Sequence, residues 1–194
     1  MKKQLFILLI SILLCTLSSY AAEWEQSFKF KTVYCSDYSQ PFTYYGLEYE
    51  FDPTEKLSLS YSLSMTYSKT HGLYLQTGTT QSIGFLLLLM DDYYNDIGWL
   101  GLLCIIVPNE VTYTITEKEK TALRGYIAPI NSEIFFNNNA ESVFTNFDLS
   151  TELGVKLRYL PKSFFEITPK IGMKRFYYSR RNAFNVGVSM GIRF

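Results

Sequence analysis

Catalysis by this chain would have to involve its single histidine, His71. An imidazole can act as general base for a serine hydroxyl, and Ser64 and Ser68 lie a few residues before His71. An acidic partner would come from the aspartates at 91, 92 and 96, and nothing in the sequence fixes their geometry relative to the histidine. Because a lone histidine in a loop is ordinarily just solvated, we predict no catalytic residue. We likewise predict no cofactor and no metal site.

Charged residues with a more informative spacing occupy alternate positions of segments that otherwise have the pattern of β-strands. Alternation places them on one face of each strand, which we expect to line the inside of a barrel. The inward set is Glu48, Glu50, Asp148, Glu152, Lys156, Arg158, Glu166, Lys170, Lys174 and Arg193. An eight-stranded barrel is just wide enough for side chains to fill, and a buried unpaired charge costs several kcal/mol. The sequence therefore predicts a network of opposite charges that plugs the lumen.

Strands of membrane-spanning length are needed to position these charges, and alternating hydrophobicity supplies them. The clearest segment is 57–67, in which Leu, Tyr and Met occupy one face and Ser and Thr the other. A membrane strand needs about 9–11 residues. The same pattern predicts eight strands, at 24–35, 42–52, 57–67, 110–117, 121–136, 144–160, 164–178 and 184–194. Pro169 cannot donate to a strand ladder, so we expect a bulge there.

The N-terminal segment predicts export from the cytoplasm. Residues 1–22 combine Lys2 and Lys3 with a short apolar stretch, and small residues favour cleavage after Ala21. The remaining residues, 23–194, have the length of a single domain. A formal net charge of zero gives no basic surface for nucleic acid. An oxidising compartment would permit a disulfide between Cys35 and Cys104, but we slightly favour two unpaired, buried thiols.

The C-terminal segment alternates in the same way and ends on an aromatic residue. Together with the signal sequence, the strands of about ten residues and the short turns on one side, it resembles the small outer-membrane β-barrels of Gram-negative bacteria. In that family the terminal strand is read by the barrel-assembly machinery; the matching positions are Phe184, Val186, Val188, Met190, Ile192 and Phe194. The resemblance implies an all-β, transmembrane up-and-down antiparallel barrel in contact with outer-membrane lipid and lipopolysaccharide. It indicates no subfamily.

Residues 68–109 do not follow the strand pattern. They contain two apolar runs, 83–90 and 97–107, that do not alternate and are too short to span a membrane as helices. The runs could be two short apolar helices that lie against the outer leaflet or cap an eight-stranded barrel. They could instead be strands of a ten-stranded barrel. Continuous leucine favours helix, so we prefer eight strands with a helical insert at about 83–107 on the outer side.

The leading functional interpretation is a non-enzymatic outer-membrane barrel with a structural or surface-interaction role and a plugged lumen. An alternative is a conduit for small or apolar molecules, because the apolar insert could line a lateral opening. A second alternative is an enzyme that modifies lipid A, an activity that the resemblance makes conceivable for a histidine in an outer loop. However, the residues after His71 lack the His-x-Ser pairing of the lipid A deacylases.

Overall fold

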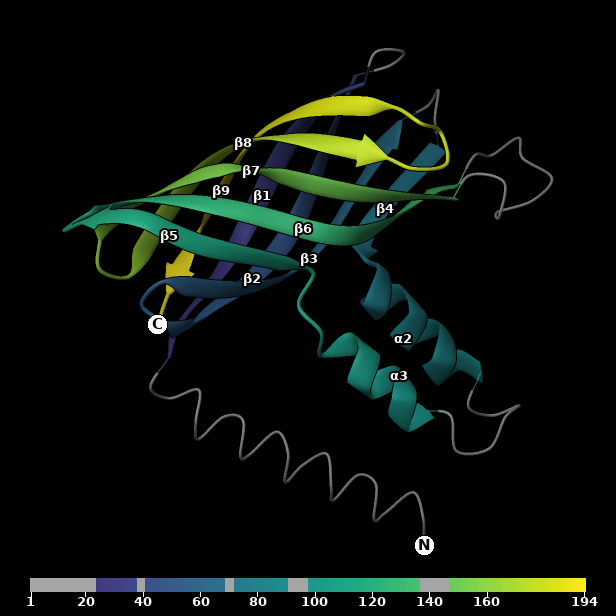
Figure 1. Ribbon diagram of the computed structural model, residues 1–194, viewed down its shortest axis with the longest axis horizontal. Coiled ribbons are helices and arrows are strands. Elements are labelled where there is room, and N and C mark those ends of the chain that lie inside the picture. Colours follow the sequence, from purple (N-terminus) through teal and green to yellow (C-terminus); the bar gives the residue numbers. More distant parts are fainter. Residues whose placement is uncertain (1–23, 38–40, 69–71, 91–97, 137–146) are drawn as a thin grey trace, which may run out of the picture.

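Antiparallel strands make up most of the computed structural model, which describes residues 24–37, 41–68, 72–90, 98–136 and 147–194 (Figure 1). The strands are β1 (Glu25–Asp37), β2 (Phe42–Thr54), β3 (Leu57–Ser68), β4 (Gly72–Gly78), β5 (Glu110–Lys118), β6 (Thr121–Phe136), β7 (Phe147–Lys162), β8 (Phe165–Phe176) and β9 (Asn182–Arg193). The two helices are α2 (Thr79–Met90) and α3 (Gly98–Ile105). The predicted signal sequence lies outside the described residues.

The sheet closes on itself because β1 pairs with β2 on one side and with β9 on the other. The first and last parts of the barrel are joined at the backbone, where Gln26 and Phe194 exchange N–H to carbonyl hydrogen bonds of 3.1 and 2.9 Å. Closure pairs the first described strand with the last. A sheet that spans a membrane has to close in this way, because lipid cannot satisfy the backbone groups of an open edge. The chain begins β1 and ends β9 at the same end of the barrel as the β2–β3, β5–β6 and β7–β8 turns, which we call the short-turn end (Figure 1). We call the opposite end the loop end.

The described strands occupy eight positions, because β4 and β5 share one place between β3 and β6. The β4 pairing with β3 reaches Thr77 opposite Leu63, and the β5 pairing starts at Glu110 opposite Ser60. Two positions of β3, Tyr61 and Ser62, lie between these pairs. The two residues that flank the helical insertion, Gly78 and Asn109, supply the same number of positions on the other side. The register along β3 is therefore continuous, as if β4 and β5 were one strand interrupted by the helices.

The neighbour on the other side adjusts to this interruption with a bulge. Between Ala128 and Asn131, β6 shifts its register against β7, and Pro129 lies within the shift. A bulge at the other proline was expected and is wrong, since β8 keeps one register with β9 through Pro169, opposite Val188. A missing N–H removes one ladder hydrogen bond without requiring an extra residue.

The two faces of the barrel wall differ as the alternation predicted. Apolar side chains such as Phe28, Leu47 and Met65 are about half exposed on the outside, at 49%, 49% and 50%, whereas Lys29 and Ser60 are fully buried inside. This distribution is the inverse of a water-soluble protein and is the one expected when lipid surrounds the barrel.

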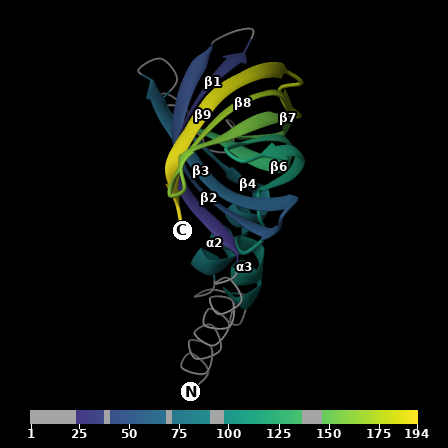
Figure 2. The ribbon, with the colours of Figure 1, turned by 90° about the vertical axis from the view of Figure 1, so that its left-hand side faces the viewer.

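The insert is helical, as preferred, but it starts within the barrel wall and does not cap the barrel (Figure 1). Residues 72–78, expected in an outer connection, form β4 in the wall, and the α2–α3 hairpin (residues 79–108) leaves the wall between β4 and β5. Figures 1 and 2 show it beside the barrel rather than over either end. The ten-stranded alternative is wrong, because the apolar runs are helices and add no strands. Within the described residues, no helix has the length and hydropathy to cross a membrane.

Candidate functional site in the barrel lumen

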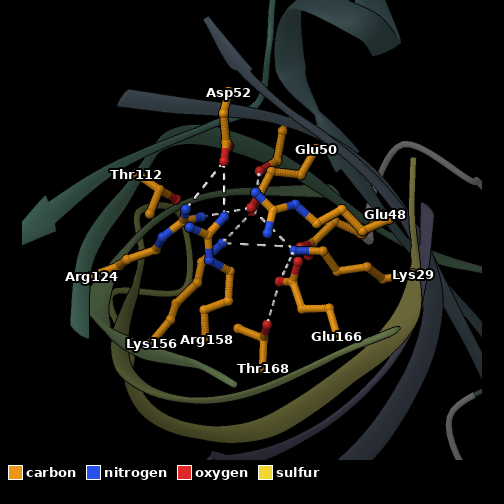
Figure 3. A network of polar contacts seen from close by, with 12 residues as sticks. Lys29, Glu48, Glu50, Asp52, Thr112, Arg124, Lys156, Arg158, Glu166 and Thr168 are labelled. Carbon is orange, nitrogen blue, oxygen red and sulfur yellow. Dashed lines mark hydrogen bonds and ion pairs between the residues drawn. The ribbon is translucent and has the colours of Figure 1, made fainter. Parts of the chain in front are cut away.

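A buried network of ion pairs occupies the lumen, and Lys29 of β1 lies near its centre (Figure 3). Its Nζ lies 2.7 Å from Oε1 of Glu166, 3.1 Å from Oε1 of Glu50 and 3.7 Å from Oε1 of Glu48. Glu48 and Glu50 come from β2, which pairs with β1, and Glu166 comes from β8, which is separated from β1 by β9. One cation thus links side chains from separate parts of the barrel.

Two arginines extend the network towards the short-turn end. Arg124 of β6 contacts Glu50 through NH1 at 2.8 Å and Asp52 through NH2 at 3.2 Å. Arg158 of β7 contacts the same Asp52 oxygen at 2.9 Å and Glu117 at 3.0 Å. The Glu117 side chain is 48% exposed, so the network runs from the fully buried centre to water.

Lys156 connects this network to the strand that follows the helical hairpin. Its Nζ lies 3.4 Å from Oε2 of Glu50 and forms an ion pair with Glu110, the first residue of β5. Its distance to Glu48 is 4.0 Å. The point where the fourth strand resumes is therefore attached to the buried charges.

A second group of charges lies nearer the loop end. Lys170 pairs with Oε1 of Glu152 at 3.1 Å, and the hydroxyl of Tyr126 donates to the same oxygen at 2.7 Å. Lys174 pairs with Glu133 at 3.1 Å and lies 3.9 Å from Glu152. Glu133 also accepts hydrogen bonds from the hydroxyls of Tyr74 and Ser150, and is fully buried.

Apolar and aromatic side chains fill the lumen beyond these charges. Val33, Cys35, Tyr44, Tyr74 and Phe176 are buried together with Ala183, and Phe42 packs against them. The Phe42 and Tyr74 rings meet edge to face at 4.9 Å, and the Lys174 ammonium lies 5.1 Å from the centre of the Tyr44 ring. The buried ion pairs thus lie nearer the short-turn end, and this aromatic layer lies nearer the loop end.

Cys35 and Cys104 do not form a disulfide with each other. Cys35 is buried in the aromatic layer, whereas Cys104 is only half buried on α3.

The structure brings most of the predicted lumen charges into contact, namely Glu48, Glu50, Glu152, Lys156, Arg158, Glu166, Lys170 and Lys174. Two others lie apart from them. Asp148 is buried but accepts hydrogen bonds from the backbone N–H groups of Tyr178 and Ser179, at 2.9 and 3.1 Å, and so stabilises the β8–β9 turn. Arg193 pairs with Glu25 at the short-turn end.

Six members of the network were not among the predicted residues: Lys29, Asp52, Glu110, Glu117, Arg124 and Glu133. Alternation places Lys29 on the polar face of its strand, so that pattern could have identified it. Arg124 and Glu133 both point inward although one position is even and the other odd. The bulge at Pro129 changes the parity of β6 between them, and no simple alternation predicts both.

The proposed assembly-signal residues lie on β9, whose apolar side chains Phe184, Val186, Met190, Ile192 and Phe194 are exposed on the outside of the barrel. Val188 is partly buried between them. Their role in assembly stays a prediction. His71 and the aspartates at 91, 92 and 96 lie outside the described residues. In the part of the chain that is described, no cluster of His, Cys, Asp and Glu side chains could hold a metal ion.

A shallow cavity of about 640 Å³ opens at the short-turn end, between the β5–β6 turn and the β7–β8 turn. Its lining includes Glu25, Lys120, Arg193 and Phe194. None of the residues that line it belongs to the buried ion-pair network.

Comparison with known proteins finds similarity in structure only. No family model matches the chain, and no curated protein matches its sequence. The N-terminal β-barrel domain of OprF from Pseudomonas aeruginosa has a TM-score of 0.52 at 12% identity, over 87% of this chain and 97% of that one. Ail from Yersinia pestis (TM-score 0.46, 13% identity, 89% and 99% covered) and Neisserial surface protein A (0.47, 9%, 88% and 95%) are also similar. The protein therefore has the fold of the small eight-stranded β-barrels of outer membranes.

Proposed function

We propose that the protein is an outer-membrane barrel with a structural or surface-interaction role and a lumen that is closed to solutes. The observation that carries this proposal is the buried ion-pair network around Lys29 and Glu50. Removing charges from water is costly, and each cation in the network is offset by carboxylates at short range. A solute could pass only by separating these pairs and moving the aromatic layer at Tyr44 and Tyr74.

The proposed location is the outer membrane of a Gram-negative bacterium, reached after cleavage near Ala21 and insertion by the barrel-assembly machinery. The apolar outer face would then contact lipid and lipopolysaccharide. Strand alternation and the fold support this location, and no nucleic-acid partner or cofactor is part of the proposal.

We also infer that the protein is not an enzyme. If so, the lipid A of cells that express the His71→Ala variant has the same mass spectrum as that of cells with the unchanged protein. A difference between the two spectra would favour the lipid A-modifying alternative.

The closed lumen can be tested through Cys35, which is buried in the aromatic layer and faces inward. A Cys104→Ser variant leaves Cys35 as the thiol of the mature chain. In the folded barrel in detergent, we expect a small charged thiol reagent to modify Cys35 only after unfolding, because water does not reach it. The measurement is the rate of labelling, followed by mass spectrometry.

The matched control places a thiol at an exposed position of the β5–β6 turn. A Glu119→Cys variant that also carries Cys35→Ser and Cys104→Ser should be labelled orders of magnitude faster than Cys35. Equal rates at the two positions would mean that the lumen is open to water, and the proposal of a closed barrel would then be wrong.

A second candidate function is a conduit for small or apolar molecules, and the interruption of the fourth strand favours it. Between β3 and β6 the wall changes from β4 to β5 at the base of the apolar hairpin, a place where a lateral opening could form. Deleting residues 79–108 would join the two strands. If the protein is a conduit, this deletion reduces uptake of apolar solutes by cells; unchanged uptake would remove the basis for this candidate.

A further inference from the structure

The helical hairpin is apolar on every side. Among its described residues, 79–90 and 98–108, none is charged, and the polar side chains lie at the start of α2. Phe85, Leu89 and Trp99 are exposed by 55%, 77% and 49%. A helix on the surface of a soluble protein has a polar face, and so does a helix that lies in a membrane interface. Two helices without a charged or polar face fit neither environment, but they fit hydrocarbon.

The hairpin also leaves the barrel wall about half-way between its two ends, where the hydrocarbon layer would surround a membrane-spanning barrel. It starts after Gly78 and ends before Asn109, in the middle of the fourth strand rather than at an end of the barrel (Figure 1). On either side of this point, Leu63 of β3 and Ile127 of β6 belong to the exposed apolar surface of the barrel. The hairpin is therefore continuous with the surface that the barrel presents to lipid.

The junction satisfies its backbone groups with side chains, as a water-free environment demands. The side chain of Asn109 accepts a hydrogen bond from the Ser62 N–H at 3.0 Å and donates to the Ser62 carbonyl at 3.2 Å, and so replaces a backbone partner in the ladder. Gln81 accepts from the Gly78 N–H at 3.1 Å and donates to the Val107 carbonyl at 3.4 Å.

Two further contacts are of the kind found in lipid. The Tyr61 hydroxyl of β3 donates to the backbone carbonyl of Ile106, just after the end of α3. The helices cross at Gly84 and Gly101, where a Cβ on either residue would lie 2.5 or 2.7 Å from the carbonyl oxygen of the other. Close approach of backbones at small residues is the usual way in which helices associate in membranes, where burial of apolar surface gives no driving force.

We propose that the α2–α3 hairpin is embedded in the hydrocarbon layer beside the barrel and that lipid acyl chains are its partner. The continuity of its apolar surface with the barrel wall favours lipid over a protein partner. With 12 residues, α2 is about 18 Å long, close to the roughly 15 Å from the middle of a bilayer to its headgroups. A hairpin that starts at mid-depth can therefore tilt and end near a polar layer.

Tryptophan fluorescence can test this proposal, because the sequence has two tryptophans and one of them lies on α3. In a Trp24→Phe variant, Trp99 is the reporter. The full mature chain is placed in phosphatidylcholine vesicles whose acyl chains carry bromine at different depths. We expect blue-shifted emission, a greater loss of fluorescence with bromine deep in the chains than near the headgroups, and little loss with aqueous iodide.

The matched control is Trp99→Phe, in which Trp24 reports from the short-turn end, stacked on Phe51 at 5.4 Å. Its strongest quenching should come from shallow bromine. The difference between the unchanged protein and Trp99→Phe gives the Trp99 signal a second time, without the Trp24→Phe substitution. Strong quenching of Trp99 by iodide would place the hairpin in water, and protection from both quenchers would mean that protein covers it; either result overturns the proposal.

Discussion

Among individual residues, Lys29 is central to the proposal of a closed lumen, because it contacts three buried carboxylates. It is fully buried and its ammonium group lies between carboxylates of Glu50 and Glu166. Both carboxylates are buried as well, so water cannot replace the lysine as their hydrogen-bonding partner. The stability of the barrel should therefore depend on this cation far more than on a lysine at the surface.

Replacing Lys29 by methionine keeps the length of the side chain and removes the charge. We expect a loss of about 3–5 kcal/mol in the free energy of unfolding, because the substitution leaves buried carboxylates without their cation. The measurement is urea unfolding of the folded protein in detergent or vesicles. The exposed Lys118 at the end of β5 is the control, and Lys118→Met should change the free energy by less than about 0.5 kcal/mol. Similar effects of the two substitutions would contradict the role given to Lys29.

Among the elements, the interrupted fourth strand is the distinctive one. A strand break in a membrane barrel exposes backbone N–H and carbonyl groups, which lipid cannot satisfy. Here the amide side chains of Gln81 and Asn109 supply the missing partners. The interruption is thus stabilised locally, and the rest of the wall keeps its register.

Substitution of Asn109 by alanine should reveal this local role. Both backbone groups of Ser62 that it contacts would lose a partner, so we expect the free energy of unfolding to fall by about 1–3 kcal/mol. An Asn182→Ala substitution is the matched control, since Asn182 is exposed and binds the side chain of Arg175. If Asn109→Ala lowers the free energy of unfolding no more than the control does, the Asn109 side chain does not take the place of a backbone partner for Ser62.

Deletion of residues 79–108 should leave a folded barrel. The β3 register continues across the insertion, so joining Gly78 to Asn109 gives an uninterrupted fourth strand. We expect β-rich circular dichroism with less helical signal, and migration on SDS gels that still changes on heating. A deletion variant that fails to fold, when the unchanged chain folds under the same conditions, would mean that the hairpin is part of the barrel's core structure.

For the whole molecule, alternation of apolar and polar residues predicts most of the barrel, because one face of each strand meets lipid and the other the lumen. It predicts β3 and β7 closely. It misses β4, which has only seven residues, is followed by four polar residues and a continuous apolar run, and pairs with β3 and β6. It also misses Glu133, since the bulge at Pro129 changes which positions of β6 face the lumen. Local pattern cannot report such long-range adjustments.

The proposed closure of the lumen also concerns the whole barrel, because it rests on ion pairs that join β1, β2, β6, β7 and β8. Single-channel recording in a planar bilayer tests it most directly. With the purified, folded protein, we expect the membrane current to stay at the baseline apart from rare, brief events. A large and steady conductance, which appears with the folded protein and not with heat-denatured protein, would contradict a lumen filled by paired charges.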